Sequence, residues 1–108
     1  MRELPSIENL QCFIAAAEQL HFRRAAEQVF LTPAAFSQRI KQLEEQLGHA
    51  LFERSTRQVR LTQAGMRLLP VARAAVRASL RCVEQLETHG KKAPIRLTLG
   101  TRFELGLS

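Results

Sequence analysis

The spacing of apolar residues in the first half of the chain predicts three helices. Apolar side chains recur at helical spacing over residues 10–20, and Ser6 before them is a residue type that often caps a helix. A short helix follows with Ala25 and Ala26, whose small side chains let a neighbouring helix approach closely. After a sharp turn at 31–32, a longer helix begins. Three such helices can share one core.

The longer helix is marked at both ends. Thr32 can accept a hydrogen bond from a first-turn amide, and Pro33 suits the first helical position, where the amide needs no partner. Gly48 provides the stop. One apolar stripe runs between them, formed by Phe36, Ile40, Leu43 and Leu47. A short helix, a turn and a longer two-faced helix are typical of a helix-turn-helix, whose second helix enters the major groove of DNA.

The polar face of this longer helix is the predicted reading edge. Helix geometry places Ala34, Gln38 and Lys41 opposite the apolar stripe, with Ser37 beside them. The carboxylates at 44–45 lie further along, where phosphates would repel them, so only the first two or three turns are expected near DNA.

Residues 49–65 predict a small hairpin. Short apolar runs at 51–52 and 59–61 flank a polar segment, a pattern typical of two strands and a turn. Arg54 and Arg57 near the tip can follow the DNA backbone or enter a minor groove, where narrow A·T-rich DNA favours a planar cation. A single basic loop is more often a solvated surface, but its position after a helix-turn-helix favours a DNA-binding wing.

A long helix is expected after Thr62, continuing to about Gly90. At 1.5 Å per residue it would extend roughly 40 Å, beyond the small core that precedes it. Its near-heptad apolar seam favours pairing with a second copy, and packing back onto the first helix is the alternative. Pro70 inside it is expected to bend the helix or remove a hydrogen bond. The predicted dimerisation positions are Leu69, Ala72, Val76, Leu80, Val83 and Leu86.

Composition and charge narrow the function classes only partly. With 108 residues and 45% hydrophobic content, the chain can bury one modest core and is too short for a large enzyme. The net charge of +6 fits a nucleic-acid partner. However, residues 1–65 hold eight Lys or Arg against seven Asp or Glu, whereas residues 66–108 hold eight against three. The case for DNA binding therefore depends on where individual cations lie.

Membrane, metal and catalytic classes find no support in the residues. No apolar run approaches membrane-spanning length, and the three glutamates in the first twenty residues are untypical of a signal peptide, so a cytoplasmic location is expected. Cys12 and Cys82 are isolated and are interpreted as buried thiols. The three histidines lack metal-ligand spacing, and no triad can be built on Ser37, so neither a metal site nor catalysis is expected.

The last residues change in character. Residues 90–94, Gly-Lys-Lys-Ala-Pro, predict a hinge, and residues 95–99 alternate apolar and polar side chains with the period of a strand. Because one strand is not a domain, the simplest interpretation is the front part of a longer protein, cut just after a second domain begins. The alternative is a disordered or crystal-paired tail.

A set of motifs over residues 8–90 is similar to the amino-terminal domain of LysR-type transcriptional regulators. The motifs are Leu10-x-x-Phe13, Phe22-x-x-Ala25-Ala26, Thr32-x-x-Ala35-Phe36-Ser37, Ile40-Lys41-x-Leu43-Glu44, Gly48-x-x-Leu51-Phe52-x-Arg54 and Leu61-Thr62-x-x-Gly65. The resemblance implies a mainly helical fold. Residues 1–65 would form a winged helix-turn-helix of three helices and a two-stranded wing, residues 66–89 a dimerising linker helix, and residues 95–108 the start of a truncated ligand-sensing domain.

The resemblance also implies a function. It describes a sequence-specific regulator of transcription with its recognition helix at 33–47 in the major groove and its wing at 53–60 on the minor groove or backbone. The implied partners are double-stranded DNA, a second copy in a dimer, further copies in a full-length tetramer, and RNA polymerase. No cofactor is expected for the present residues, and a small-molecule co-inducer is expected for the sensor domain. The alternative is a helical interaction module without specific DNA binding.

The family's base contacts carry over only in part. Members commonly begin the recognition helix with Ser-Gln-Pro-Ala, and the Gln often contacts a base, whereas this chain has Thr-Pro-Ala-Ala at 32–35. Pro33 has no side-chain donor, which leaves apolar contact with a thymine methyl, alongside Ala34. Ser37 and Gln38 match groove-facing positions, and Gln38 can pair with adenine through two hydrogen bonds.

Other positions are assigned to the DNA backbone or the wing. Arg23 stands where Ser or Thr usually caps the short helix, which loses a cap worth about 1 kcal/mol and gains a cation near a phosphate. Arg57 matches the wing residue that enters the minor groove. The full set of predicted phosphate or wing contacts is Arg23, Thr32, Arg39, Lys41, Arg54 and Arg57.

Overall fold

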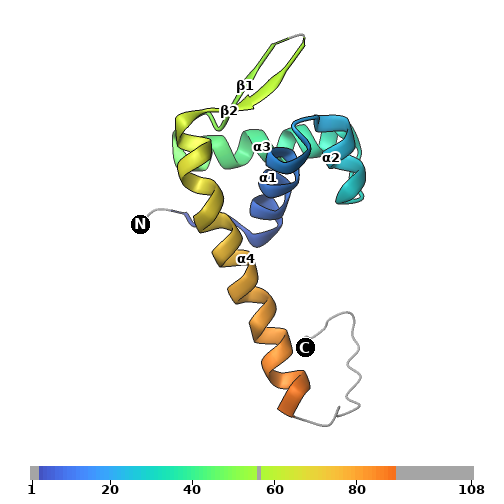
Figure 1. The fold of residues 1–108 in the computed structure, drawn as a ribbon, viewed down its shortest axis with the longest axis vertical. Helices are drawn as coiled ribbons and strands as arrows, with labels where there is room; N and C mark the ends of the chain where they lie inside the picture. The colour runs from blue at the N-terminus through green and yellow to red at the C-terminus, as the bar shows by residue number, and fades with distance from the viewer. Residues whose placement is uncertain (1–2, 56, 90–108) are drawn as a thin grey trace.

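The computed structural model describes residues 3–55 and 57–89. Within them the chain forms, in order, α1 (Ile7–Gln19), α2 (Phe22–Gln28), α3 (Pro33–Leu47), β1 (Phe52–Arg54), β2 (Val59–Leu61) and α4 (Gln63–His89), as Figure 1 shows. The strands pair in an antiparallel hairpin. The predicted mainly helical fold with a two-stranded wing and a long last helix is confirmed. The predicted hinge at 90–94 and strand at 95–99 lie outside the described residues.

Predicted caps hold the starts of three helices. The side-chain oxygens of Ser6, Thr32 and Thr62 each accept a hydrogen bond from the amide three residues later, at 3.0 to 3.1 Å. Gly48 ends α3 with a φ of 75°, a left-handed conformation that glycine adopts without steric cost, and its amide donates to the carbonyl of Glu44. The boundaries of the helix-turn-helix therefore follow from local sequence.

The start of α2 corrects one prediction. Nδ1 of His21 accepts a hydrogen bond from the amide of Arg24 at 3.1 Å, so His21 is the cap. Arg23 lies in the first turn of α2, and the prediction that it occupies the cap position was wrong. An imidazole nitrogen can replace a hydroxyl here because both are acceptors. Beyond the other end of α2, Phe30 has a left-handed backbone conformation with a φ of 60°, and its side chain is exposed.

The core lies where α1, α2 and α3 meet the base of the wing and the first turns of α4. Ala25 and Ala26 are fully buried, as expected for residues that let α2 pack closely on its neighbours. The Phe22 ring meets those of Phe36 and Phe52 edge to face, with centroids 5.5 and 5.4 Å apart. Such pairs contribute about 0.5 to 1.5 kcal/mol beyond their buried area. The first strand of the wing is therefore packed into the helical core.

The wing joins α4 through a tight junction. The Thr62 hydroxyl donates to the carbonyl of Ala50 at 2.7 Å, and its amide donates to the carbonyl of Leu51 at 3.0 Å. Gly65 is the third residue of α4, and a Cβ on it would lie 2.3 Å from the same Leu51 carbonyl oxygen. Only glycine fits at that distance, so the first turn of α4 packs directly against the backbone at the base of the wing.

The two halves of α4 have different surroundings. Ala72 is 1% exposed and belongs to the core, and Leu69 and Val76 pack against that core. Ala72 was predicted as a dimerisation residue, but its small side chain lets α4 pack closely in the core, so it is not available to a partner. This half of α4 also packs on α1, which is the alternative that the sequence left open. Beyond it, Leu80 and Val83 are about half exposed (54% and 53%).

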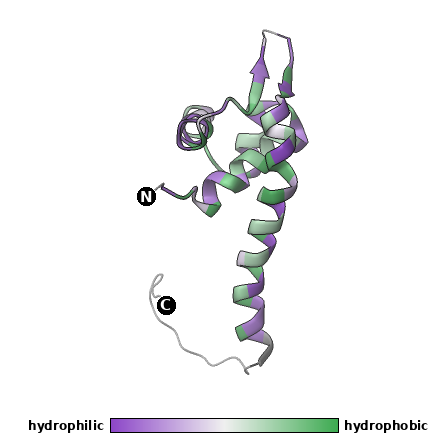
Figure 2. Ribbon diagram, turned by 90° about the vertical axis from the view of Figure 1, so that its left-hand side faces the viewer, coloured by the Kyte–Doolittle hydropathy of each residue, from purple (hydrophilic) through white to green (hydrophobic). Residues whose placement is uncertain are grey.

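Figure 2 shows α4 leaving the helical head, with hydrophobic positions continuing along its length. Leu86 near its end is 77% exposed. The helix is not interrupted at Pro70. Since proline has no amide hydrogen, the carbonyl of Met66 receives no helical hydrogen bond from it, as predicted. Among the described residues, no helix combines the length and the apolar character that crossing a membrane requires.

Candidate nucleic-acid interface

The predicted reading edge lies on the exposed face of α3. Phe36 and Ile40 are fully buried on the opposite face, which turns Ala34, Gln38 and Lys41 outward. Ser37 is half-buried at the border of the exposed face, and Pro33 is exposed at its start. The Thr32 hydroxyl is occupied as a cap by accepting the amide of Ala35, but as a hydroxyl it keeps one donor. The structure thus brings the predicted base-contacting residues together at one end of one helix.

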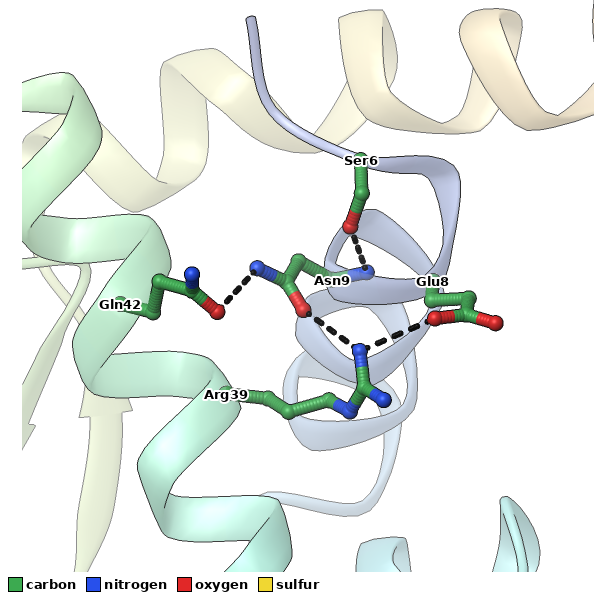
Figure 3. A network of polar contacts seen from close by, with 5 residues as sticks. All are labelled: Ser6, Glu8, Asn9, Arg39 and Gln42. Atoms are coloured by element: carbon green, nitrogen blue, oxygen red, sulfur yellow. Dashed lines mark hydrogen bonds and ion pairs between the residues drawn. The ribbon is translucent and has the colours of Figure 1, made fainter. Parts of the chain in front are cut away.

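One flank of α3 is held to α1 by a network of polar side chains, shown in Figure 3. Nη1 of Arg39 donates to Oε1 of Glu8 at 3.1 Å and to Oδ1 of Asn9 at 3.2 Å. The Asn9 side chain, in a residue that is 2% exposed, also donates through Nδ2 to Oε1 of Gln42 at 3.2 Å. A buried amide needs such partners because leaving its polar atoms unpaired is costly. The network fixes the position of α3 on α1.

This network gives Arg39 a contact that the sequence did not predict. Its guanidinium points toward α1 and pairs there with Glu8, while its contact with phosphate stays a prediction. The network also has a direction. Because a guanidinium only donates, the side-chain oxygen of Asn9 must face Arg39. The NH₂ group of Asn9 then faces the side-chain oxygen of Gln42. The NH₂ group of Gln42 points away from Asn9, as Figure 3 shows. Sequence spacing could not reveal this link, which spans some thirty residues.

The other flank of α3 faces the base of the wing. Oε2 of Glu44 accepts the amide of Leu51 at 2.8 Å, and its Oε1 lies 3.8 Å from Nη2 of Arg54. The Arg54 guanidinium lies over the Phe22 ring, 4.6 Å from its centroid. Arg54 is the last residue of β1, next to the tip as predicted, and its side chain lies against the helices. Glu44, expected only to avoid phosphates, has a structural contact that the sequence analysis missed.

The tip of the wing is organised by one hydroxyl. Oγ of Ser55 accepts the amides of Arg57 and Gln58 at 3.2 and 3.0 Å. Arg57 is exposed there, on a hairpin that projects away from the helical head in Figure 1. Arg60, further along β2, is paired with Glu53 on β1 at 3.5 Å. The structure therefore places Arg57 where a DNA groove could receive it.

The cations of the head fall into two groups. Within the described residues, four cations are exposed and make no ion pair, so their charges are available to phosphates: Arg23, Arg24, Lys41 and Arg57. Arg39 and Arg54 are instead paired with glutamates of the same chain. Since an intramolecular carboxylate competes with a phosphate for the same guanidinium, the first group holds the stronger candidates for backbone contact.

The two cysteines differ. Cys12 is buried, and burial raises the pKa of its thiol above the ordinary value, with nearby Arg39 lowering it and Glu8 raising it. Cys82 is exposed on α4, so the interpretation of both as buried thiols was wrong for Cys82. Over residues 3–55 and 57–89, no three His, Cys, Asp or Glu side chains are grouped so as to hold a metal ion.

Comparison with known proteins places this arrangement in a family. Residues 7–66 match the model of the bacterial regulatory helix-turn-helix proteins of the lysR family. An uncharacterized HTH-type transcriptional regulator of Sinorhizobium fredii, y4mQ, is 45% identical over 103 residues, covering 95% of this chain and 34% of the relative. The chain spans about a third or less of the length of the curated relatives it matches.

Solved structures show the same architecture. The oxidized form of OxyR from Corynebacterium glutamicum superposes with a TM-score of 0.76 at 35% identity, over 79% of this chain and 26% of that one. A complex of the CbnR DBD with DNA gives a TM-score of 0.74 at 29% identity, over 80% of this chain and 99% of that one. With its family model, fold and recognition-helix geometry in agreement, the chain belongs to the LysR family of bacterial regulatory helix-turn-helix proteins.

Proposed function

We propose that this chain is the DNA-binding head of a transcriptional regulator, which reads a specific sequence with α3 in the major groove and places its wing on the minor groove or backbone. The observation that carries the proposal is the exposed face of α3, where Gln38 and Lys41 point outward, beside an exposed wing tip with Arg57. A major groove admits one helix, and a neighbouring hairpin can then follow the duplex. The CbnR DBD, which has this fold, forms a complex with DNA, and this supports DNA as the partner.

The residues at the edge of α3 have distinct proposed roles. Gln38 carries both a donor and an acceptor and can pair with adenine N6 and N7, which makes it the main source of base preference. Pro33 and Ala34 can contact a thymine methyl, and Ser37 at the border can donate or accept one hydrogen bond. Lys41 is a flexible point charge suited to a phosphate, which positions the helix without reading sequence.

We also propose that the chain works as a dimer and under effector control. Support for the dimer is the apolar row on the second half of α4, where Leu80, Val83 and Leu86 are exposed. An exposed apolar row on a helix that extends beyond the head can be buried by pairing with the same helix of a second copy. A tetramer, a small-molecule effector bound by a sensor domain, and contact with RNA polymerase rest on the family resemblance alone.

Specific DNA binding can be tested by fluorescence anisotropy. Duplexes from beside the chain's own gene and shuffled duplexes of the same composition would be titrated at 50 and 200 mM salt. A preference for the native duplex at both salt concentrations is expected, with weaker binding to both duplexes at the higher salt because counterions are released on binding. A folded dimer with no preference for any native duplex would favour the alternative of a helical interaction module.

A further inference from the structure

Glu44 connects the recognition helix to the wing. It lies near the end of α3, on the flank that faces β1, and its side chain is only 18% exposed. One carboxylate oxygen accepts the amide of Leu51 just before β1 at 2.8 Å, and the other faces Arg54 at the end of β1 at 3.8 Å. A single side chain of α3 thus contacts both ends of the first wing strand. The hydrogen bond from the Leu51 amide to the carboxylate is charge-assisted, and such bonds are stronger than neutral ones, more so when partly buried.

Arg54 extends this contact to α2. Its guanidinium lies over the Phe22 ring, and that ring packs edge to face on Phe36 of α3 and on Phe52 of β1. The carboxylate of Glu44 therefore completes a unit that includes α2, α3 and β1. We call Glu44, Arg54 and Phe22 the wing anchor.

The wing needs such an anchor because its own strands pair only with each other. A two-stranded hairpin is marginal in water, so its direction depends on contacts with the helices. Three strand residues at about 3.4 Å each place the tip roughly 10 Å from the base, so a rotation of about 10° at the base moves the tip by about 2 Å. A shift of that size is enough to break a hydrogen bond.

We propose that Glu44 is a positioning residue for DNA recognition: it fixes the wing relative to α3, so that Arg57 reaches the minor groove while Gln38 lies in the major groove. The inference rests on the proposed function of DNA binding. Glu44 itself does not contact DNA, since a carboxylate is repelled by phosphates. Its effect on affinity passes through the wing.

Glu45 offers a matched control, because it is the next residue of α3, carries the same charge and is exposed. If the charge of Glu44 acted only by repelling DNA, then Glu44→Gln and Glu45→Gln would both strengthen binding. If the wing anchor positions Arg57, the two substitutions must change the affinity for DNA in opposite directions. Glu45→Gln is expected to strengthen binding slightly, and Glu44→Gln to weaken it, with Glu44→Ala weakening it by about tenfold.

A double-mutant cycle with Arg57→Ala tests whether the effect passes through the wing. In the Arg57→Ala background, Glu44→Ala is expected to lower the affinity for DNA by at most about twofold. The reason is that the wing then lacks the Arg57 cation whose position Glu44 is proposed to fix. Equal costs of Glu44→Ala in the two backgrounds would overturn the positioning role while leaving the proposed function intact. Glu44→Gln, which keeps the size and an acceptor for Leu51, serves in the same cycle if Glu44→Ala does not fold.

A measurement without DNA separates this inference from the proposed function. In the free protein, amide hydrogen exchange at Leu51 and nanosecond mobility of Arg57 measured by ¹⁵N relaxation are both expected to increase in Glu44→Ala and to stay unchanged in Glu45→Ala. Unchanged exchange and mobility in Glu44→Ala would refute the anchor whatever the DNA result. Absence of sequence preference in the unmutated protein, with the anchor intact, would instead refute the proposed function.

Discussion

At the scale of single residues, partners decide which cations can meet DNA. Lys41 and Arg39 are two positions apart on α3, yet Lys41 projects into solvent and Arg39 is paired with Glu8 of α1. Both are cations in the recognition helix, so charge alone does not separate them. The 100° turn per residue places them on different faces, and only one of these faces is covered by another helix.

Gln38 and Lys41 should respond differently to removal of the side chain. Gln38→Ala is expected to reduce the ratio of affinities for the native and a mismatched duplex, by a factor that corresponds to about 1 to 3 kcal/mol, because a base contact is lost. Lys41→Ala is expected to weaken binding to all duplexes and to lower the salt slope by about 1, because a phosphate contact is lost. Anisotropy titrations over a salt series check both. Identical behaviour of the two variants would contradict the assignment of roles.

The two thiols should differ in reactivity. Cys82 is exposed, whereas Cys12 is only 3% exposed. Burial also raises the pKa of the Cys12 thiol, so this thiol stays protonated to a higher pH than an ordinary cysteine. Iodoacetamide at pH 8 is therefore expected to modify Cys82 of the folded protein well before Cys12, as followed by mass spectrometry. In denaturant both should react at similar rates. Fast modification of Cys12 in the folded protein would show that α1 is not packed as described.

At the scale of elements, the recognition helix is held on both flanks. Asn9 and Arg39 connect it to α1, and Glu44 connects it to the wing. Its exposed edge is left free of these contacts, so the helix can present that edge without reorganising. Rigid support of this kind is what a reading element requires, because misplaced donors do not reach base edges.

The junction between the wing and α4 should not tolerate a side chain at position 65. Gly65→Ala is expected to lower the free energy of unfolding by about 1 to 3 kcal/mol, since the added methyl would overlap the Leu51 carbonyl and force the backbones apart. Urea denaturation followed by circular dichroism measures the change. Gln63→Ala, at an exposed position of the same helical turn, is the control and should change stability little. Equal stability of the two variants would mean that the junction is looser than described.

At the scale of the whole molecule, the two halves of α4 have different roles: the first half belongs to the fold, and the second half is proposed to pair with a second copy. Its first half completes the core through Ala72, and its second half carries exposed apolar residues past the head. A change in the first half should therefore disturb the monomer, and one in the second half should disturb only the proposed dimer. Heptad spacing alone could not separate these effects, because both halves carry the same pattern.

A charge in the second half of α4 should dissociate the proposed dimer without unfolding the head. Val83→Asp is expected to give a monomer in light scattering with an unchanged melting temperature of the head, because Val83 is exposed within one chain. Ala78→Asp, at an exposed position on another face of α4, should remain a dimer. Val76→Asp is expected to lower stability as well, since Val76 packs against the core. A dimer retained in Val83→Asp would contradict the assembly proposed for α4.

The sequence by itself determined the elements and the outward face of α3. Caps such as Ser6, Thr32 and Thr62, the stop at Gly48 and the helical spacing of apolar residues act within a few positions of the chain, so local rules are enough to find them. The reading edge follows because it lies opposite the apolar stripe. The cap of α2 was missed because His21 is an uncommon residue for that role.

Only the tertiary structure decided which side chains are available for binding. Four residues have contacts with other elements that the sequence did not predict: Arg39 with α1, Arg54 with α2 and α3, Glu44 with the wing, and Ala72 with the core. The physical reason is that a charge or an apolar face is directed by what lies within a few ångströms of it. Periodicity gives the face on which a residue lies, whereas the neighbour across that face comes from a distant part of the chain and appears only when the helices and wing are packed together.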